Sequence, residues 1–110
     1  MTLKELKTID INAKEWCDQV NGNSYFSSIV TLNFGQPNEK KIILPFQIGY
    51  GSQYHFESME EIKKLFPRSH WYKKIMFESE IKKKYNLTIN SNIKKNCLKR
   101  ELHTILMIKS

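Results

Sequence analysis

The side chains most often used for metal binding and acid–base catalysis are sparse in this 110-residue chain. Its three histidines, His55, His70 and His103, are far apart, and none belongs to an HxxxH, HExxH or mixed Cys/His ligand pattern. For each one an ordinary surface or packing role is favoured over a role as metal ligand or general base. The sequence therefore predicts no metal site.

Candidate nucleophiles and paired carboxylates are also isolated. Cys17 lies beside acidic residues, whereas Cys97 lies in a basic segment, the setting in which reactive thiols occur. Cys97 is thus the one candidate, but no base or orienting residue accompanies it, so the role of a bystander is favoured. Glu78 and Glu80 are two residues apart on an expected helix and point to different faces. These patterns predict a protein without enzymatic activity and imply no cofactor.

A glycine pair invites comparison with phosphate-binding loops. Gly49-Tyr50-Gly51 lacks the third glycine of a dinucleotide fingerprint and the Lys-Ser/Thr of a nucleotide-binding loop. Glycine is the usual residue wherever the backbone needs a positive φ. A tight turn after a strand is the favoured interpretation.

Basic side chains dominate the second part of the chain. Residues 1–62 carry 5 Lys and Arg against 8 Asp and Glu, a net charge of −3, whereas residues 63–110 carry 13 against 3, a net charge of +10. Lysines contact phosphates without regard to sequence, and aromatic residues between them stack on bases. One lysine alone is best explained as part of a solvated helix surface, but the whole asymmetry favours a surface for a polyanionic or acidic partner. The predicted partner-binding residues are Lys63, Lys64, Arg68, Trp71, Tyr72, Lys73, Lys74, Lys82, Lys83, Lys84, Lys94, Lys95, Lys99 and Arg100.

The elements that must position these residues begin with an ambiguous N-terminal segment. Residues 3–11 mix helical and strand spacing, which predicts an irregular arm or strand. Asn12 and Glu15 then form a capping box for a short helix through Val20. Trp16 lies four residues before Val20, so both side chains are expected to pack inward.

The next segments predict a β-hairpin. Residues 24–34 and 41–48 both alternate, with the even-numbered apolar residues of each strand on one face. The sequence GQPNEK between them is rich in turn-forming residues. Pro45 has no N–H to donate to a sheet, which places it at an edge or in a bulge.

The remaining elements complete an α+β domain. The sequence predicts a helix over 58–66 before Pro67, a helix over 70–85 capped by Ser69 and ended by Asn86, a strand over 87–93 that returns to the hairpin, and a terminal strand or tail over 102–108. This order predicts an antiparallel sheet, made of the central hairpin and the C-terminal strand, with helices packed on one face. Residues 1–110 are one domain, in which 1–62 form the scaffold half and 63–110 the basic binding half.

Composition sets the broad class of the protein. Hydrophobic residues make up 40% and aromatic residues 12% of the chain, enough to fold as a globular domain. No segment approaches the roughly 20 apolar residues that span a bilayer, and the N-terminal segment lacks the apolar region of a signal peptide. The expected location is therefore the cytoplasm, without membrane contact.

About half of the chain resembles a module found in small proteins of phages and mobile elements. The resemblance covers Ile9 to Tyr54, IDINAKEWCDQVNGNSYFSSIVTLNFGQPNEKKIILPFQIGYGSQY. Its matching features are NAKEW (12–16), VNGNSYFS (20–27), VTLN (30–33), PFQIGYGSQY (45–54) and CLKREL (97–102). Within this module, Asn21, Gly22, Tyr25, Gln47 and Tyr50 are expected to serve turns and packing.

Some proteins with this kind of module resemble type II anti-CRISPR proteins, which bind the Cas9 effector and block DNA binding or cleavage. The resemblance implies an inhibitor in a bacterial host cytoplasm whose partner is a Cas9-type effector or its guide-RNA complex. Residues 67–96 depart from the family pattern, so the particular target is expected to be specified there. A DNA mimic is acidic, so the charge of +7 disfavours mimicry and favours direct stoichiometric contact.

The alternative function is that of a basic nucleic-acid-binding module or phage regulator. It would use the same basic surface to contact the nucleic-acid backbone directly. No recognition-helix or RNP signature is present in the sequence to support it.

Overall fold

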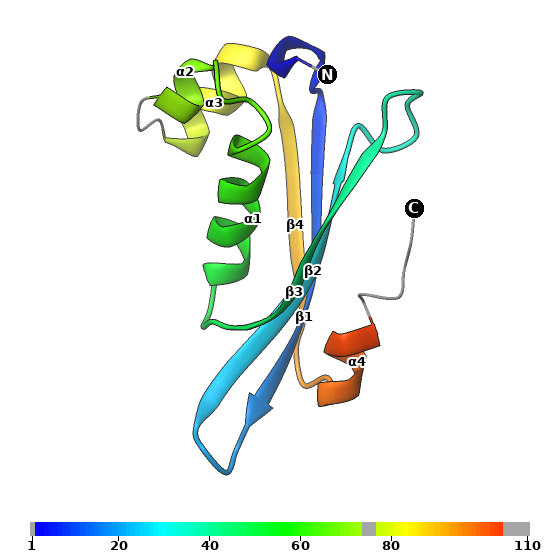
Figure 1. Ribbon diagram of the computed structural model, residues 1–110, viewed down its shortest axis with the longest axis vertical. Helices are drawn as coiled ribbons and strands as arrows, with labels where there is room; N and C mark the ends of the chain where they lie inside the picture. Colours follow the sequence, from blue (N-terminus) through cyan, green and yellow to red (C-terminus); the bar gives the residue numbers. More distant parts are fainter. Residues whose placement is uncertain (1, 74–76, 105–110) are drawn as a thin grey trace.

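Alternating apolar residues build a four-stranded mixed sheet at the centre of the protein (Figure 1). The computed structural model describes residues 2–73 and 77–104. The strands are β1 (Thr8–Asp18), β2 (Asn23–Leu32), β3 (Lys40–Ile48) and β4 (Thr88–Lys94), in the order β3-β2-β1-β4. The β2–β3 pair is antiparallel, as expected, and the β1–β2 pair, which was not predicted, is antiparallel as well, but β4 pairs with β1 and runs parallel to it. The C-terminal strand therefore joins the sheet beside β1, away from the hairpin.

The long strand β1 shows that the predicted helix over 12–20 is wrong. Ile9, Ile11 and Ala13 are buried at alternate positions, and β1 pairs along both of its edges. Val20, expected to pack inward, is 92% exposed. The local capping pattern loses to the burial and the two rows of hydrogen bonds that a central strand gains.

The hairpin of β2 and β3 is confirmed, and so is the special position of Pro45. Ser28 pairs with Leu44. The next pair joins Phe26 with Gln47, which leaves one residue of β2 opposite two of β3, Pro45 among them. Pro45 therefore lies both in an edge strand and at a bulge. Because a bulge adds one residue, the even-numbered side chains of β3 face the core before it and the opposite side of the sheet after it.

The predicted helices over 58–66 and 70–85 are present with other bounds, and a further helix over 99–104 was not predicted. The helices are η1 (Leu3–Glu5, a 3-10 turn), α1 (Gln53–Lys63), α2 (His70–Lys73), α3 (Glu78–Tyr85) and α4 (Lys99–Thr104). The predicted helix over 70–85 is divided, since Phe77 is extended with φ −71° and ψ 150°, and residues 74–76 lie outside the described residues. Ser69 accepts a hydrogen bond at the start of α2, and Asn86 ends α3 in the left-handed region, which confirms both predicted caps.

Helices lie on both faces of the sheet. Figure 1 shows α1, α2 and α3 on one face and α4 on the other. The predicted arrangement on one face thus holds for three of these four helices. A terminal strand or tail was predicted over 102–108. Residues 102–104 belong instead to α4, and residues 105–110 lie outside the described part of the chain.

The main core joins the two parts of the sequence that charge had separated. Ile9 and Val30 from the first part pack in the same buried cluster as Trp71, Ile81 and Leu87 from the second. The α+β domain is confirmed as one unit, and residues 63–104 are as much part of its framework as residues 2–62. The division into a scaffold half and a binding half therefore does not separate two bodies in space.

Candidate binding surface

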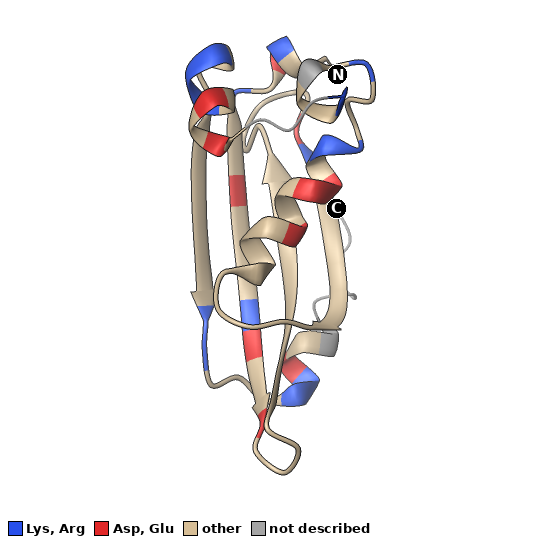
Figure 2. Ribbon diagram, turned by 90° about the vertical axis from the view of Figure 1, so that its left-hand side faces the viewer, with Lys and Arg blue, Asp and Glu red and all other residues tan. Residues whose placement is uncertain are grey.

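The predicted partner-binding residues gather at two opposite ends of an elongated molecule, which measures 44 × 29 × 20 Å along its principal axes. Figure 2 shows lysines and arginines toward both ends of the long axis and few on the strands between them. The α3 end carries Lys63, Lys64, Arg68, Lys73, Lys82, Lys83 and Lys84. The α4 end carries Lys94, Lys95, Lys99 and Arg100. Lys74 lies outside the described residues.

Several cations of the α3 end have no carboxylate partner. Lys63 and Lys64 form ion pairs one helical turn back, with Nζ–Oε distances of 3.0 and 3.3 Å to Glu60 and Glu61. By contrast, the exposed Arg68, and likewise Lys82 and Lys83, have no side-chain hydrogen bond or ion pair within residues 2–73 and 77–104. Unpaired cations on a helix end favour contact with an anionic surface.

The two aromatic residues predicted as anchors have different environments. Trp71 is only 4% exposed and packs in the main core, so it is not a surface anchor. The short helix α2 turns its side chain toward Phe56 and Met59, in the wall of a pocket of about 400 Å³. Tyr72, the next residue on α2, is 48% exposed and is available for contact. Adjacent positions on a helix face different directions, which explains the difference.

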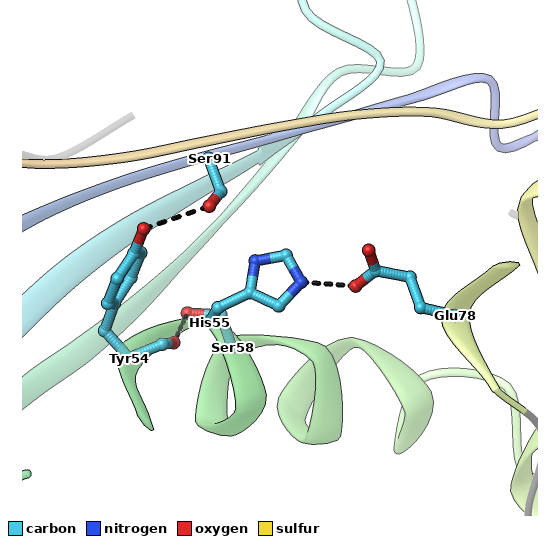
Figure 3. A network of polar contacts seen from close by, with 5 residues as sticks. All are labelled: Tyr54, His55, Ser58, Glu78 and Ser91. Carbon is cyan, nitrogen blue, oxygen red and sulfur yellow. Dashed lines mark hydrogen bonds and ion pairs between the residues drawn. The ribbon is translucent and has the colours of Figure 1, made fainter. Parts of the chain in front are cut away.

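A polar network holds α1 in place between β4 and α3 (Figure 3). The hydroxyl of Tyr54 lies 3.0 Å from Oγ of Ser91 on β4, and Oγ of Ser58 donates to the carbonyl of Tyr54 at 2.7 Å. His55, the residue after Tyr54, contacts the carboxylate of Glu78 at the start of α3. His55 thus connects two helices, which agrees with the structural role favoured from the sequence. The side chains of the other two histidines lie outside the described part.

A groove at the α3 end collects residues from three separate segments. Lys4 comes from η1, Leu65 and Arg68 come from the segment after α1, and Tyr85 ends α3. The groove has a volume of about 600 Å³. Sequence reasoning found Arg68 but missed Lys4 and Tyr85 as members of one site, because no spacing in the sequence connects them. The η1 segment is far from α3 along the chain.

Asn33 fixes the η1 wall of this groove. Its side chain is buried, and its Oδ1 accepts hydrogen bonds from the backbone N–H of Lys7 at 2.7 Å and of Thr8 at 3.2 Å. Its Nδ2 donates to the carbonyl of Glu5 at 2.9 Å and to Oδ1 of Asn38 at 3.1 Å. The residue has φ 52°, a value that asparagine tolerates better than most residues. One side chain therefore connects η1, β1 and the hairpin turn.

The α4 end is built around an aromatic cluster on the face opposite the main core. The rings of Trp16, Tyr25 and Phe46 contact one another, with centroid distances of 5.4 Å for Trp16–Tyr25, 4.8 Å for Tyr25–Phe46 and 6.2 Å for Trp16–Phe46. The ammonium of Lys99 lies 5.4 Å from the Trp16 ring centroid. Lys94 lies 3.9 Å from the carboxylate of Glu101. Lys99 thus lies over an aromatic ring and Lys94 beside a carboxylate, although all four cations at this end are exposed.

The two cysteines have different environments. Cys97, the candidate reactive thiol, is buried, and its Sγ donates to the carbonyl of Lys94 at 3.3 Å, whereas Cys17 is exposed. Within residues 2–73 and 77–104, no three His, Cys, Asp or Glu side chains lie close enough to hold a metal ion. No helix in the same ranges is long and apolar enough to cross a membrane.

Comparison with known proteins adds no relative to these observations. No protein-family model, curated protein or solved structure matches the chain. The candidate binding surface therefore rests on the geometry and the charge of the α3 end.

Proposed function

We propose that this protein inhibits a Cas9-type effector by direct, non-enzymatic binding in the cytoplasm of a bacterial host. The partner is the effector protein or its guide-RNA complex, and the result is a block of DNA binding or cleavage. The proposal is supported by the resemblance of residues 9–54 and 97–102 to a module of small phage proteins, some of which resemble type II anti-CRISPR proteins, and by the net charge of +7.

The observation that carries the proposal is the set of unpaired cations at the α3 end. Arg68, Lys82 and Lys83 lie at one end of the molecule without carboxylate partners among the described residues, and Tyr72 lies exposed on the neighbouring helix. Aromatic and arginine side chains contribute much of the binding energy of protein interfaces. Such an end can contact an acidic face of a nuclease domain or the backbone of the guide RNA. It cannot imitate DNA, because a mimic needs the opposite charge.

A cleavage assay tests the proposal. Purified type II effectors, each loaded with guide RNA, are mixed with target plasmid and an excess of this protein. We expect at least one effector to lose cleavage. If every effector of a broad panel cleaves at its normal rate, the proposal is wrong for that panel.

Two charge-matched variants locate the contact. Lys82→Gln with Lys83→Gln removes two charges from the α3 end, and Lys95→Gln with Arg100→Gln removes two from the α4 end. We expect the first pair to weaken inhibition on the order of tenfold, because charges at an interface rim steer association. The second pair should leave inhibition close to that of the unmodified protein. Equal losses would show that only total charge matters.

A nucleic-acid-binding module or phage regulator is the alternative, and the same unpaired cations support it. Binding to nonspecific duplex DNA would then be tight and would fall steeply with salt concentration. Measurement of duplex binding over a range of salt concentrations separates the two functions. Tight, salt-sensitive duplex binding together with unaffected effectors favours the alternative.

A further inference from the structure

The groove at the α3 end has features that the proposed inhibition does not use. We propose that it binds a short single-stranded nucleic acid segment, with one base in the apolar groove against Tyr85 and the flanking phosphates on Lys4, Arg68 and Lys84. The inference goes beyond the proposed function, because it assigns a ligand class to the groove itself and holds with or without an effector.

The size and lining of the groove suit a flat apolar ring. Its volume of about 600 Å³ lies within the ~300–1,000 Å³ typical of ligand sites. Leu3, Leu65, Pro67 and Tyr85 supply most of its wall. A nucleic-acid base is planar and can stack on an aromatic ring whatever its sequence. The groove therefore matches the least polar part of a nucleotide.

The charges around the groove suit phosphate. Lys4 and Arg68 are exposed and have no side-chain hydrogen bond or ion pair within the described ranges. Lys84 is not among the residues that line the groove, but its Nζ lies over the Tyr85 ring, 5.5 Å from the centroid. Two cations in the lining and a third beside Tyr85 match a base between two phosphates.

The carboxylate of Glu5 lies beside this groove, on the lining residue Thr2. Oε1 of Glu5 accepts hydrogen bonds from the backbone N–H of Thr2 at 2.9 Å and from its hydroxyl at 3.0 Å. The Thr2 backbone hydrogen bond is the largest cause that lowers the pKa of Glu5. The carboxylate thus caps η1, and no Asp or Glu is among the described residues that line the groove.

The groove is held in its open shape by the main core. Leu3 is 7% and Phe66 is 6% exposed, and both belong to the buried cluster. Asn33 ties the η1 wall to the sheet through the hydrogen bonds described above. A preformed site costs less ordering free energy when a ligand binds.

A single strand fits these features better than a duplex or an acidic peptide. In a duplex the base faces are stacked inside, so only phosphates could reach the cations and the apolar groove would stay empty. An acidic peptide would be drawn by the charge, but its carboxylates need no ring to stack on. Dependence on Tyr85 therefore distinguishes the single strand from both.

Binding of a fluorescent oligouridine, followed by anisotropy over a range of salt concentrations, tests the inference. For Lys4→Gln with Arg68→Gln, the salt slope should fall by about 1.4, because each single-strand phosphate contact contributes about 0.7. For Tyr85→Leu, we expect affinity to fall roughly 5- to 150-fold with an unchanged slope, because stacking is lost and charge is kept. The charge-matched pair Lys95→Gln with Arg100→Gln should bind as the unmodified protein does.

Four results would overturn the inference. They are no binding of the oligouridine, equal loss in the two charge-matched pairs, duplex binding as tight as single-strand binding, and binding of polyglutamate in place of the oligonucleotide. Tyr85 packs against the core, so emission of the buried Trp71 checks that Tyr85→Leu folds. Lys4→Gln with Arg68→Gln changes only exposed side chains and stays informative in any case. The binding assay includes no effector, so a negative result for the groove does not bear on the proposed inhibition, which the cleavage assay tests separately.

Discussion

The two ends of the molecule carry similar side chains in different surroundings. At the α3 end, unpaired cations stand around a groove whose apolar wall continues into the main core. At the α4 end, Lys99 lies over Trp16 and Lys94 lies beside Glu101. The same residue types therefore stand beside an open groove at one end and beside an aromatic cluster at the other. The environment of a cation decides its role, and the sequence alone does not show that environment.

The largest expected effect is on the free energy of unfolding, and it compares how much the packing of each end contributes to it. Ile81 of α3 and Leu102 of α4 are both fully buried, but only Ile81 belongs to the main buried cluster. Ile81→Ala should lower the free energy of unfolding by about 2–5 kcal/mol, because a cavity opens in a core that cannot collapse fully. Leu102→Ala should mainly loosen α4. Urea unfolding followed by circular dichroism measures the global change.

Trp16 provides the second measurement, because it lies at the α4 end. In a Trp71→Phe background its emission reports the α4 end alone. With Leu102→Ala we expect this emission to change at a lower urea concentration than the circular dichroism does. If Leu102→Ala and Ile81→Ala shift both signals equally, the two ends are one energetic unit and the contrast between them is wrong.

Asn33 tests whether the wall of the groove depends on one side chain. Asn33→Ala removes four part-buried hydrogen bonds, three of them to backbone groups, at a residue with positive φ. We expect a loss of about 3 kcal/mol in the free energy of unfolding. Hydrogen exchange at the Lys7 and Thr8 amides should rise more than at the α4 end.

The matched control for this change is Asn38→Ala. Asn38 is exposed and accepts only one of the four hydrogen bonds. Asn38→Ala should lower the free energy of unfolding by well under half as much as Asn33→Ala does. Oligouridine binding should weaken with Asn33→Ala and stay normal with Asn38→Ala. Equal effects of the two variants would mean that Asn33 does not hold the groove.

The parts of the fold that could be predicted are those whose signals are local. Alternation identified the hairpin, Pro45 indicated the bulge, and Ser69 and Asn86 marked helix ends. Each of these depends on the chemistry of one residue and its near neighbours. The α+β class followed from the order of such elements.

The predictions that were wrong, and the features that were not predicted, depend on contacts between residues far apart in the sequence. The segment from Asn12 to Asp18 has a good helix start, but β2 and β4 lie on either side of it and the strand wins. Because residues 12–20 were expected to form a helix, the stacking of Trp16 on Tyr25 could not be foreseen. The same holds for the groove, which joins Lys4 to Tyr85 only after folding.

The smallest expected effect is the acid response of the α4 end. Glu101 accepts a hydrogen bond from the backbone N–H of Leu98, at 2.5 Å, and this bond is the largest cause that lowers the pKa of its carboxyl group below the ordinary 4.5. A lowered pKa in the folded state means that the charged carboxylate stabilises the fold above pH 4.5. That contribution is lost as the pH falls through the lower folded-state pKa.

Acid titration of Trp16 emission, in the Trp71→Phe background, measures this response. We expect the α4 end to loosen as the pH drops below 4.5 and the signal of Glu101→Gln to stay flatter over the same range, because glutamine does not titrate. The α3 end provides the comparison, since the pKa of Glu5 is also lowered, by the backbone hydrogen bond of Thr2. Glu5→Gln should leave the Trp16 signal unchanged, because Glu5 lies in η1 at the other end. A change in Trp16 emission with Glu5→Gln would show that the charge of Glu5 affects the stability of the α4 end.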